Sequence, residues 1–188
     1  MTDRVLVLCT ANRIRSVLFT ALLDRYLATS GWSAHVVVSS AGLLEAGAPP
    51  AREAFTAAAR FGFDLSGHRS RRLDRDLIDA SHLILGAERN HVAEVWALRH
   101  EALARTFTYV EFAQLLSVSA PRTQDEDLDA FVGRVRGGSG RDVRTVMAAP
   151  DSWDVTDPVG RPTPTVLAVA AELDRLATGI GAATWPAA

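Results

Sequence analysis

Short apolar runs at intervals along the chain predict the strands of a sheet. Residues 5–8 form an apolar run of β-branched character, as expected for a buried strand. The valines at 36–38 and the apolar residues within 80–85 repeat this pattern, and residues 106–109 repeat it more weakly. The sequence therefore predicts four strands, at 5–8, 36–38, 80–85 and 106–109.

Between these runs the apolar residues recur at spacings of three and four, which is the period of a helix. The clearest case begins at Ser16 and ends at Gly31, a residue type that commonly terminates helices. Further helices are predicted at 51–61, closed by Gly62, at 90–98, over most of 111–136 with a break at Pro121, and at 163–178. We expect a flexible loop at 137–140 and irregular structure from there to about residue 151.

Strands that alternate with helices predict an α/β fold in which a parallel sheet has helices on both faces. Four strands in one layer make a small doubly wound sheet, and 188 residues suffice for one such domain. We expect this single domain to span residues 1–179, with a flexible tail at 180–188. Ligands of such folds bind at the carboxyl ends of the strands, so the segment after residues 5–8 is a natural place for chemistry.

Composition narrows the classes of protein to which the chain can belong. Apolar residues make up 48% and charged residues 22%, as in ordinary globular proteins, and the net charge of −2 provides no basic footprint for nucleic acid. No apolar run is long enough to span a membrane, and the N-terminus lacks a signal-peptide layout. One cysteine excludes an internal disulfide and favours a reducing compartment. We therefore expect a cytoplasmic protein with neither nucleic acid nor membrane as partner.

The segment between the first strand and the first helix has the residues of a phosphate-binding loop. It consists of Cys9, Thr10, Ala11, Asn12, Arg13, Ile14, Arg15 and Ser16. Five residues between Cys9 and Arg15 are enough to wrap around a phosphate, with backbone N–H groups pointing inward and the helix N-terminus adding positive charge. Arg15 has the planar fork that binds two phosphate oxygens.

A lone cysteine at a strand end is usually an inert core residue, but the neighbours of Cys9 favour a nucleophile. The positive charge of the loop favours its thiolate form, and Ser16 can donate a hydrogen bond to the sulfur. In-line attack of that sulfur on phosphorus would give a phosphocysteine. The leaving oxygen then needs a proton donor, for which Asp157, stiffened by the proline after it, is the candidate; Asp154 is a rival and Asp151 a weaker one.

Cysteine, five residues, arginine and serine after a first strand, with Asp157-Pro158 near the C-terminus, resemble the low-molecular-weight protein tyrosine phosphatase family. The order is characteristic, because other cysteine-dependent phosphatases usually place the acid before the nucleophile. Ser40-Ala41-Gly42 after the second strand and the glycine-to-histidine-arginine segment at 62–73 extend the likeness. The third strand ends in Ala87-Glu88, where relatives often carry Met-Asp. The resemblance covers nearly the whole chain.

The resemblance implies a role for each matched residue. Cys9 would be the nucleophile, Arg15 the clamp of the transition state and Asp157 the general acid and base. Asn12 would shape the loop in a left-handed conformation, which asparagine tolerates, while His68 and Ser16 would support the loop from behind. The substrate would be a phosphorylated protein or a small aryl phosphate, inorganic phosphate would be the product, and neither metal nor organic cofactor is implied.

Several positions depart from the family pattern. Relatives usually have glycine where Ala11 stands, so alanine would add strain if that position needed a positive φ. A common second cysteine is replaced by Ile14, which leaves the nucleophile without a partner for a protective disulfide. Arg13 replaces a small or apolar residue at the substrate entrance; it would attract a second phosphate or an acidic peptide and repel a cationic phosphoarginine. Val17 stands where proline is usual.

The tyrosine-specific relatives often show an aromatic pair after Asp157-Pro158, and here Val159-Gly160 follows instead. Trp153 is a candidate substitute for that aromatic wall. The basic residues Arg69, Arg71, Arg72 and Arg75 read as a solvated face, or less simply as a site for acidic substrates. The remaining histidines, His35, His82, His91 and His100, lack metal-ligand spacing and read as structural or solvated.

Three functions remain open at this stage. The first is a phosphomonoester hydrolase, most simply a protein tyrosine phosphatase. The second is an arsenate reductase that uses an external small thiol, because the chain lacks the cysteines of an internal relay. The third is a catalytically weak protein that binds phosphate or phosphopeptides through the altered loop. Turnover of an aryl phosphate, thiol-dependent consumption of arsenate, and binding without turnover distinguish them.

Overall fold

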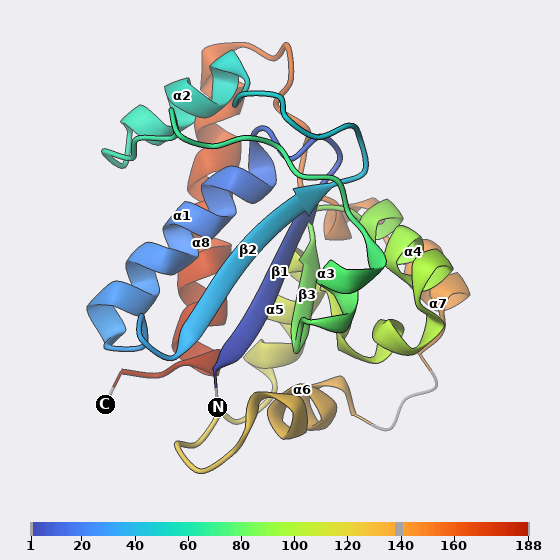
Figure 1. The fold of residues 1–188 in the computed structure, drawn as a ribbon. Coiled ribbons are helices and arrows are strands. Elements are labelled where there is room, and N and C mark those ends of the chain that lie inside the picture. Colours follow the sequence, from blue (N-terminus) through green and yellow to red (C-terminus); the bar gives the residue numbers. More distant parts are fainter. Residues whose placement is uncertain (1, 138–140, 188) are drawn as a thin grey trace.

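A four-stranded parallel sheet forms the centre of the molecule (Figure 1). A computed structural model describes residues 2–137 and 141–187. The strands are β1 (Asp3–Cys9), β2 (Val36–Gly42), β3 (Leu83–Gly86) and β4 (Thr106–Thr108). They lie in the order β2-β1-β3-β4, and every neighbouring pair is parallel. The predicted α/β fold and its four parallel strands are confirmed.

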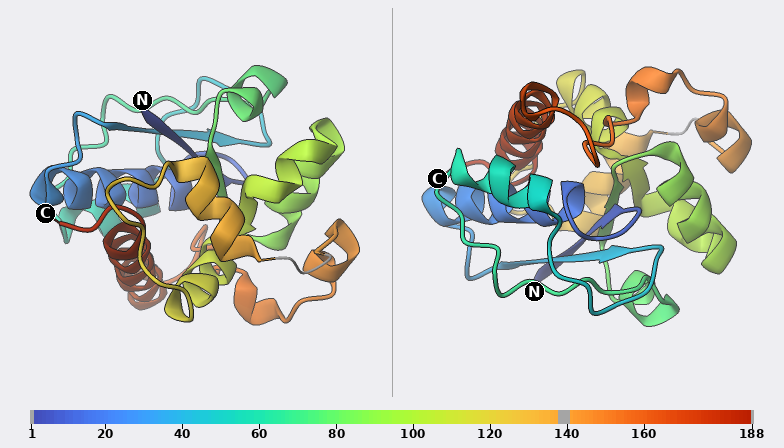
Figure 2. Two further views of the ribbon diagram at one scale, coloured as in Figure 1. Left: turned by 90° about the horizontal axis from the view of Figure 1, so that it is seen from below. Right: turned by 90° about the horizontal axis from the view of Figure 1, so that it is seen from above.

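Helices cover both faces of the sheet. They are α1 (Arg15–Ser30), α2 (Arg52–Ala59), α3 (Arg75–Asp79), α4 (Arg89–Leu98), α5 (Tyr109–Ser117), α6 (Leu128–Arg136), α7 (Val143–Met147) and α8 (Thr163–Thr184), with 3-10 turns η1 (His100–Arg105) and η2 (Asp151–Trp153). Figure 2 shows α1 and α8 on the opposite side of the sheet from α3. The doubly wound arrangement follows from these two helical layers.

Alternation of side chains along β1 divides the core in two. Val5, Val7 and Cys9 face the larger cluster, which includes the apolar sides of α1, α5, α6 and α8. Leu6 and Leu8 face a smaller cluster that includes residues of α3, α4 and η1. Because both faces of the strand are buried, β1 is apolar nearly throughout, which explains why its sequence is a continuous apolar run.

The chain crosses from one side of β1 to the other between β2 and β3, which makes the carboxyl end of β1 a topological switch point. Cys9 is the last residue of β1, and α1 begins at Arg15. Gly42, at the end of β2, pairs with Cys9 in register. The loop between β1 and α1 therefore lies at the carboxyl edge of the sheet, where the sequence predicted that a ligand would bind (Figure 1).

The C-terminal segment differs from the expected flexible tail at 180–188. Helix α8 continues to Thr184, and Trp185 is completely buried. Its indole Nε1 donates to Asp3 Oδ2 at 2.8 Å, and Tyr26 donates to its carbonyl at 3.2 Å. Gly181 lies so close to the Tyr26 ring that a Cβ there would sit 2.4 Å from it. The expected boundary at residue 179 is therefore wrong, because α8 packs against the core beyond it.

The segment that precedes the C-terminal helix is also more regular than expected. Helix α7 and the 3-10 turn η2 occupy part of the stretch predicted to be irregular. The Asp142 side chain caps α7 by accepting a hydrogen bond from Thr145 N at 2.7 Å. Most of the expected flexible loop at 137–140 lies outside the described residues. Within residues 2–137 and 141–187, no helix combines the length and apolarity required to cross a membrane.

Candidate active site

Asn12 organises the loop between β1 and α1. It has φ 52°, the left-handed conformation that the sequence predicted, and its side chain is fully buried. Its Oδ1 accepts from Arg71 N at 2.9 Å, while its Nδ2 donates to Ser16 Oγ and Ser40 Oγ, each at 2.9 Å. His68 Nε2 lies 2.8 Å from the Asn12 carbonyl. These contacts fix the loop from its outer side and leave its inner side for a ligand.

Ala11 fits the loop without backbone strain. Among the described residues other than glycine, only Asn12 has a positive φ, so Ala11 adopts an ordinary backbone conformation. The position where glycine is needed is Gly42 on the neighbouring strand. A Cβ there would lie 2.7 Å from Asn12 N and 2.8 Å from the Ala11 carbonyl carbon. The Ser40-Ala41-Gly42 segment therefore owes its glycine to the close approach of the loop.

Cys9 lies at the base of the loop with its sulfur 3.0 Å from Ser16 Oγ. Both residues are buried. Because Ser16 Oγ already accepts from Asn12 Nδ2, its own hydrogen is left to point at the sulfur. The N-terminus of α1 adds positive charge on the same side. A hydroxyl donor and a helix N-terminus thus face the sulfur, and the contact with Ser16 is the one predicted from the sequence.

Arg15 is nearly fully buried beside Cys9, with partners from three parts of the chain. Its Nη1 contacts the Glu88 carboxylate and donates to the Val155 carbonyl at 2.8 Å. Its Nη2 lies 3.3 Å from Thr10 Oγ1 and 3.4 Å from Asp157 Oδ2. Burial lowers the pKa of Arg15, but hydrogen bonding and charge from Glu88, followed by smaller contributions from Asp157 and Cys9, raise it overall above its ordinary value. The guanidinium therefore stays charged and its plane is fixed.

Glu88 and His91 support the site but were not identified from the sequence as part of it. Glu88 precedes α4, and its backbone N donates to His91 Nδ1 at 2.9 Å. His91 Nε2 lies 3.3 Å from Thr10 Oγ1, which ties α4 to the loop between β1 and α1. Burial, together with the charge of Arg15, lowers the pKa of His91 to about 4, so the ring is neutral. The available signal was the pair itself, a glutamate before a predicted helix and a histidine three residues later.

Asp157 lies at the rim above Cys9, and its two rivals do not. Asp157 lines the same cavity as Cys9, with about half of its side chain exposed. Its Oδ1 accepts from Val159 N at 3.1 Å. Asp154 and Asp151 instead pair with Arg89, at 2.8 Å and 2.6 Å. Of the three aspartates considered from the sequence, the structure brings only Asp157 to the cysteine.

The cavity above Cys9 has a volume of about 260 Å³. Its lining residues are Cys9, Thr10, Ala11, Arg13, Ile14, Arg15, Leu44, Ala51, Asp157 and Val159. Leu44 and Val159 are largely exposed and provide apolar walls, and none of these lining residues is aromatic. Arg13 also lines the cavity, and its Nε donates to the Pro49 carbonyl at 2.8 Å. The cavity is therefore a small, positively charged pocket with aliphatic sides.

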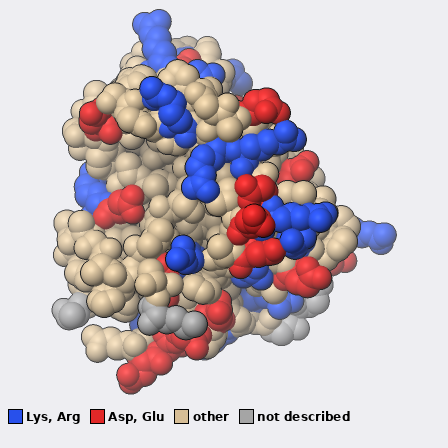
Figure 3. Space-filling view, in the orientation of Figure 1, with Lys and Arg blue, Asp and Glu red and all other residues tan. Residues whose placement is uncertain are grey.

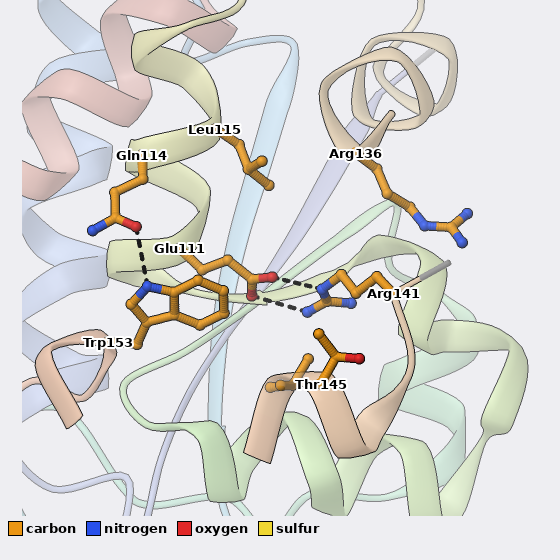
Figure 4. A pocket seen from close by; sticks show the side chains of 8 residues that line it. Glu111, Gln114, Leu115, Arg136, Arg141, Thr145 and Trp153 are labelled. Carbon is orange, nitrogen blue, oxygen red and sulfur yellow. Dashed lines mark hydrogen bonds and ion pairs between the residues drawn. The ribbon is translucent and has the colours of Figure 1, made fainter. Parts of the chain in front are cut away.

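Trp153 does not replace the missing aromatic wall. Its Nε1 donates to Gln114 Oε1 at 3.0 Å, and the ring lines a different cavity of about 380 Å³ (Figure 4). That cavity also contains the buried ion pair between Arg141 and Glu111. The interpretation of Trp153 as a substrate-stacking residue is wrong, because the 3-10 turn η2 directs it toward α5.

The basic run lies in the loop that precedes α3 and in the first residue of that helix. All four of its arginines are exposed, namely Arg69, Arg71, Arg72 and Arg75. Arg72 forms an exposed pair with Glu45 at 2.9 Å. On the face seen in Figure 3, basic and acidic side chains are intermingled. Among the described residues, no group of three or more His, Cys, Asp and Glu side chains is arranged to hold a metal ion.

Comparison with known proteins identifies relatives of this chain. Residues 4–136 match the family model described as low molecular weight phosphotyrosine protein phosphatase. The low molecular weight protein-tyrosine-phosphatase Etp of Escherichia coli K12 is 31% identical over 126 residues, which cover 66% of this chain and 81% of Etp. The family match ends before Asp157, so the position of that residue rests on its geometry.

Solved structures share the fold at lower identity. The tyrosine phosphatase AmsI of Erwinia amylovora superposes with a TM-score of 0.69 and 20% identity, covering 98% of this chain and 94% of that one. The YwlE arginine phosphatase of Geobacillus stearothermophilus gives a TM-score of 0.66 and 23% identity, covering 95% and 90%. The fold thus extends over nearly all of the chain, including the segment beyond the family match.

Proposed function

Because this chain belongs to the low molecular weight phosphotyrosine protein phosphatase family, we propose that it hydrolyses phosphate monoesters through a phosphocysteine on Cys9. Members of this family are cysteine-dependent phosphatases, and Cys9 is the one cysteine in the sequence. The observation that carries the proposal is that one cavity brings together Cys9, Arg15 and Asp157, three groups that the chemistry needs.

In the first step the Cys9 thiolate attacks phosphorus in line with the ester bond. The bond between phosphorus and the leaving oxygen breaks, and Asp157 gives its proton to that oxygen, so the product leaves as a neutral alcohol or phenol. The guanidinium fork of Arg15 and the loop N–H groups hold the other phosphate oxygens. The rest of this proposed phosphate-binding loop consists of Thr10, Ala11, Asn12, Arg13, Ile14 and Ser16.

In the second step a water molecule attacks the phosphocysteine. Asp157, now ionised, accepts a proton from the water, the bond between sulfur and phosphorus breaks, and inorganic phosphate leaves. The sulfur departs as a thiolate, and the Ser16 hydroxyl at 3.0 Å stabilises that charge. Asn12 and His68 keep the loop in place through both steps. The first step removes a proton from Asp157 and the second step returns one, so no external acid or base is needed.

The pocket favours aryl phosphates, including phosphotyrosine in proteins. Leu44 and Val159 offer apolar walls for a ring, although without the stacking of an aromatic residue. The Etp relative is named a protein-tyrosine-phosphatase, whereas the YwlE structure is named an arginine phosphatase. Arg13 in the cavity lining disfavours phosphoarginine, because its charge repels a second guanidinium. A nucleophile that depends on a reduced thiol suits a cytoplasmic location.

The test is the turnover of 4-nitrophenyl phosphate by the wild-type protein, Cys9→Ser and Asp157→Asn. We expect chelator-resistant activity that Cys9→Ser abolishes and Asp157→Asn lowers by about 100-fold or more, the usual contribution of a general acid. Phosphate binding without turnover by the wild-type protein would indicate a binding module instead. Thiol-dependent consumption of arsenate in the absence of ester hydrolysis would indicate a reductase.

A further inference from the structure

The turn between β3 and α4 contacts three separate parts of the active site. The Ala87 carbonyl accepts a hydrogen bond from Val155 N at 2.8 Å, and the Glu88 carboxylate pairs with the Arg15 guanidinium. The next residue, Arg89, begins α4 and points toward the segment that leads to Asp157. The contact of Ala87 holds the backbone that leads to Asp157, and the contact of Glu88 holds the Arg15 guanidinium. Arg89 has no part in the two chemical steps of the reaction, although Arg89 contacts more residues than Ala87 or Glu88 does.

All three nitrogens of the Arg89 guanidinium bind the segment from Met147 to Asp154. Nε and Nη2 donate to Asp154 Oδ2 at 3.0 Å and 2.8 Å, and Nη2 donates to Asp151 Oδ1 at 2.6 Å. Nη1 donates to the Ala149 carbonyl and, at 3.4 Å, to the Met147 carbonyl. The backbone N of Arg89 completes the set by donating to Asp154 Oδ1 at 2.7 Å.

This arrangement differs from an ordinary surface ion pair. The Arg89 side chain is 13% exposed and that of Asp154 is 28% exposed, and both Nε and Nη2 of the guanidinium donate to the same oxygen, Asp154 Oδ2. Helix α7 also packs beside α4, so the whole segment from α7 to Asp154 is fastened to one helix (Figure 1). Fixed, partly buried arginine forks of this kind hold geometry well, because few of their hydrogen bonds exchange with water.

Asp157 depends on this anchor because its own contacts are few. It is half exposed, with Val159 N at 3.1 Å and Arg15 Nη2 at 3.4 Å as its polar neighbours. Val155 is fastened on both sides, through its N to Ala87 and through its carbonyl to Arg15. Asp154, the residue before it, is held by Arg89, so two consecutive residues anchor the chain that leads to Asp157.

We propose that Arg89 is a positioning residue for the general acid: by holding Asp154, it fixes the backbone from which Asp157 reaches the leaving oxygen. The inference rests on the proposed role of Asp157 and extends it to a residue that does not touch the substrate. A displacement of the acid by a fraction of an ångström weakens proton transfer, while the nucleophile and the phosphate clamp stay in place.

The experiment measures kcat/KM for a series of aryl phosphates whose leaving phenols differ in acidity. Proton donation matters most when the leaving phenol is a weak acid and least when it is a strong one. We expect Arg89→Met to lower kcat/KM by about tenfold for phenyl phosphate and by less than about twofold for dinitrophenyl phosphate. Asp154→Asn should shift the dependence in the same direction, and Asp157→Asn should give its steepest form.

Arg99→Met is the matched control, because Arg99 pairs with Asp79 through a similar fork at the other end of α4. It should leave the dependence on leaving group unchanged. If Arg89→Met and Asp154→Asn lose the same fraction of kcat/KM for every substrate, or lose only stability, the inference is overturned while the proposed function stands. If Asp157→Asn itself shows the wild-type dependence, the acid assignment fails and the inference falls with it. Should Arg89→Met not fold, Asp154→Asn alone decides in the same way.

Discussion

His91 shows how a buried side chain can make this protein sensitive to pH. Its ring is fully buried between Thr10 and the start of α4, and it accepts a hydrogen bond from Glu88 N through Nδ1. A ring that accepts at one nitrogen must be neutral. Burial and the charge of Arg15 accordingly lower its pKa to about 4, below the value of about 6.5 for an unfolded chain.

The sign of the effect follows from where the proton binds. Below about pH 6.5 the unfolded chain takes up a proton at this histidine that the folded protein refuses until about pH 4, so the folded state loses stability across that interval. We predict that the free energy of unfolding attributable to His91 falls by about 2 kcal/mol between about pH 7 and about pH 5. Urea unfolding at both values, for wild type and His91→Gln, isolates this contribution as a difference. An equal pH dependence in both proteins would contradict it.

At the residue scale, a local pattern in the sequence identifies residues at a fixed short spacing, but it does not show which residues far apart in the chain come into contact. The fixed distance from Cys9 to Arg15 and Ser16 allowed the loop to be recognised, and Asn12 has the expected conformation. Glu88 lies 73 residues from Arg15, and nothing in the local pattern shows that the two side chains meet. Trp153 was misinterpreted for the same reason, since only the course of η2 decides which cavity it lines.

At the scale of elements, the end of α8 is the part of the fold that the sequence concealed. The sequence predicted a helix that ends at residue 178, yet the helix continues to Thr184, and Gly181 lets Tyr26 pack against it. Trp185 then closes the bottom of the sheet beside Asp3, which also pairs with Arg122. Glycine can allow close packing or end a helix, and the sequence alone does not show which of the two a given glycine does.

We predict that Trp185→Ala lowers the free energy of unfolding by about 3–5 kcal/mol, as expected for the loss of a large, fully buried aromatic side chain. Trp185 contacts the first residue of β1, whereas Cys9 is the last, so activity per folded molecule should be unchanged. Urea unfolding followed by circular dichroism measures the first effect, and Val118→Ala, at a largely exposed position, is the control. A loss below about 1 kcal/mol would restore the interpretation of a loose tail.

At the scale of the whole molecule, the site is assembled from five segments that meet at the carboxyl edge of one sheet. Cys9 ends β1 and is followed by the loop with Arg15, Gly42 ends β2, and Glu88 lies in the turn after β3. Segments around His68 and Asp157 close it from the two sides. A parallel sheet explains this convergence, because all of its strands end on the same edge. The fold class, read from the alternation of elements, thus located the site before any side chain was placed.

The single cysteine of the whole chain sets how the enzyme responds to oxidation. Peroxide converts the Cys9 thiolate to a sulfenic acid, and with Ile14 in place of a second cysteine no thiol within the chain can capture it as a disulfide. Further oxidation then gives a sulfinic acid, which ordinary thiol reductants do not reverse. We predict that peroxide inactivates the wild-type protein in a way that reductant recovers only at the earliest times.

The variant Ile14→Cys returns a potential partner to the position next to Arg15, and it should regain most of its activity on reduction after the same exposure. Activity recovery with time of exposure, together with the intact mass of each protein, measures both predictions: the wild type should gain oxygen atoms, and the variant should lose two hydrogens as its disulfide forms. Equal recovery of the two proteins, with no added oxygen in the wild type, would mean that the loop itself shields the sulfur. Burial of Cys9 beneath Arg15 and Ser16 would then protect the nucleophile in place of a second cysteine.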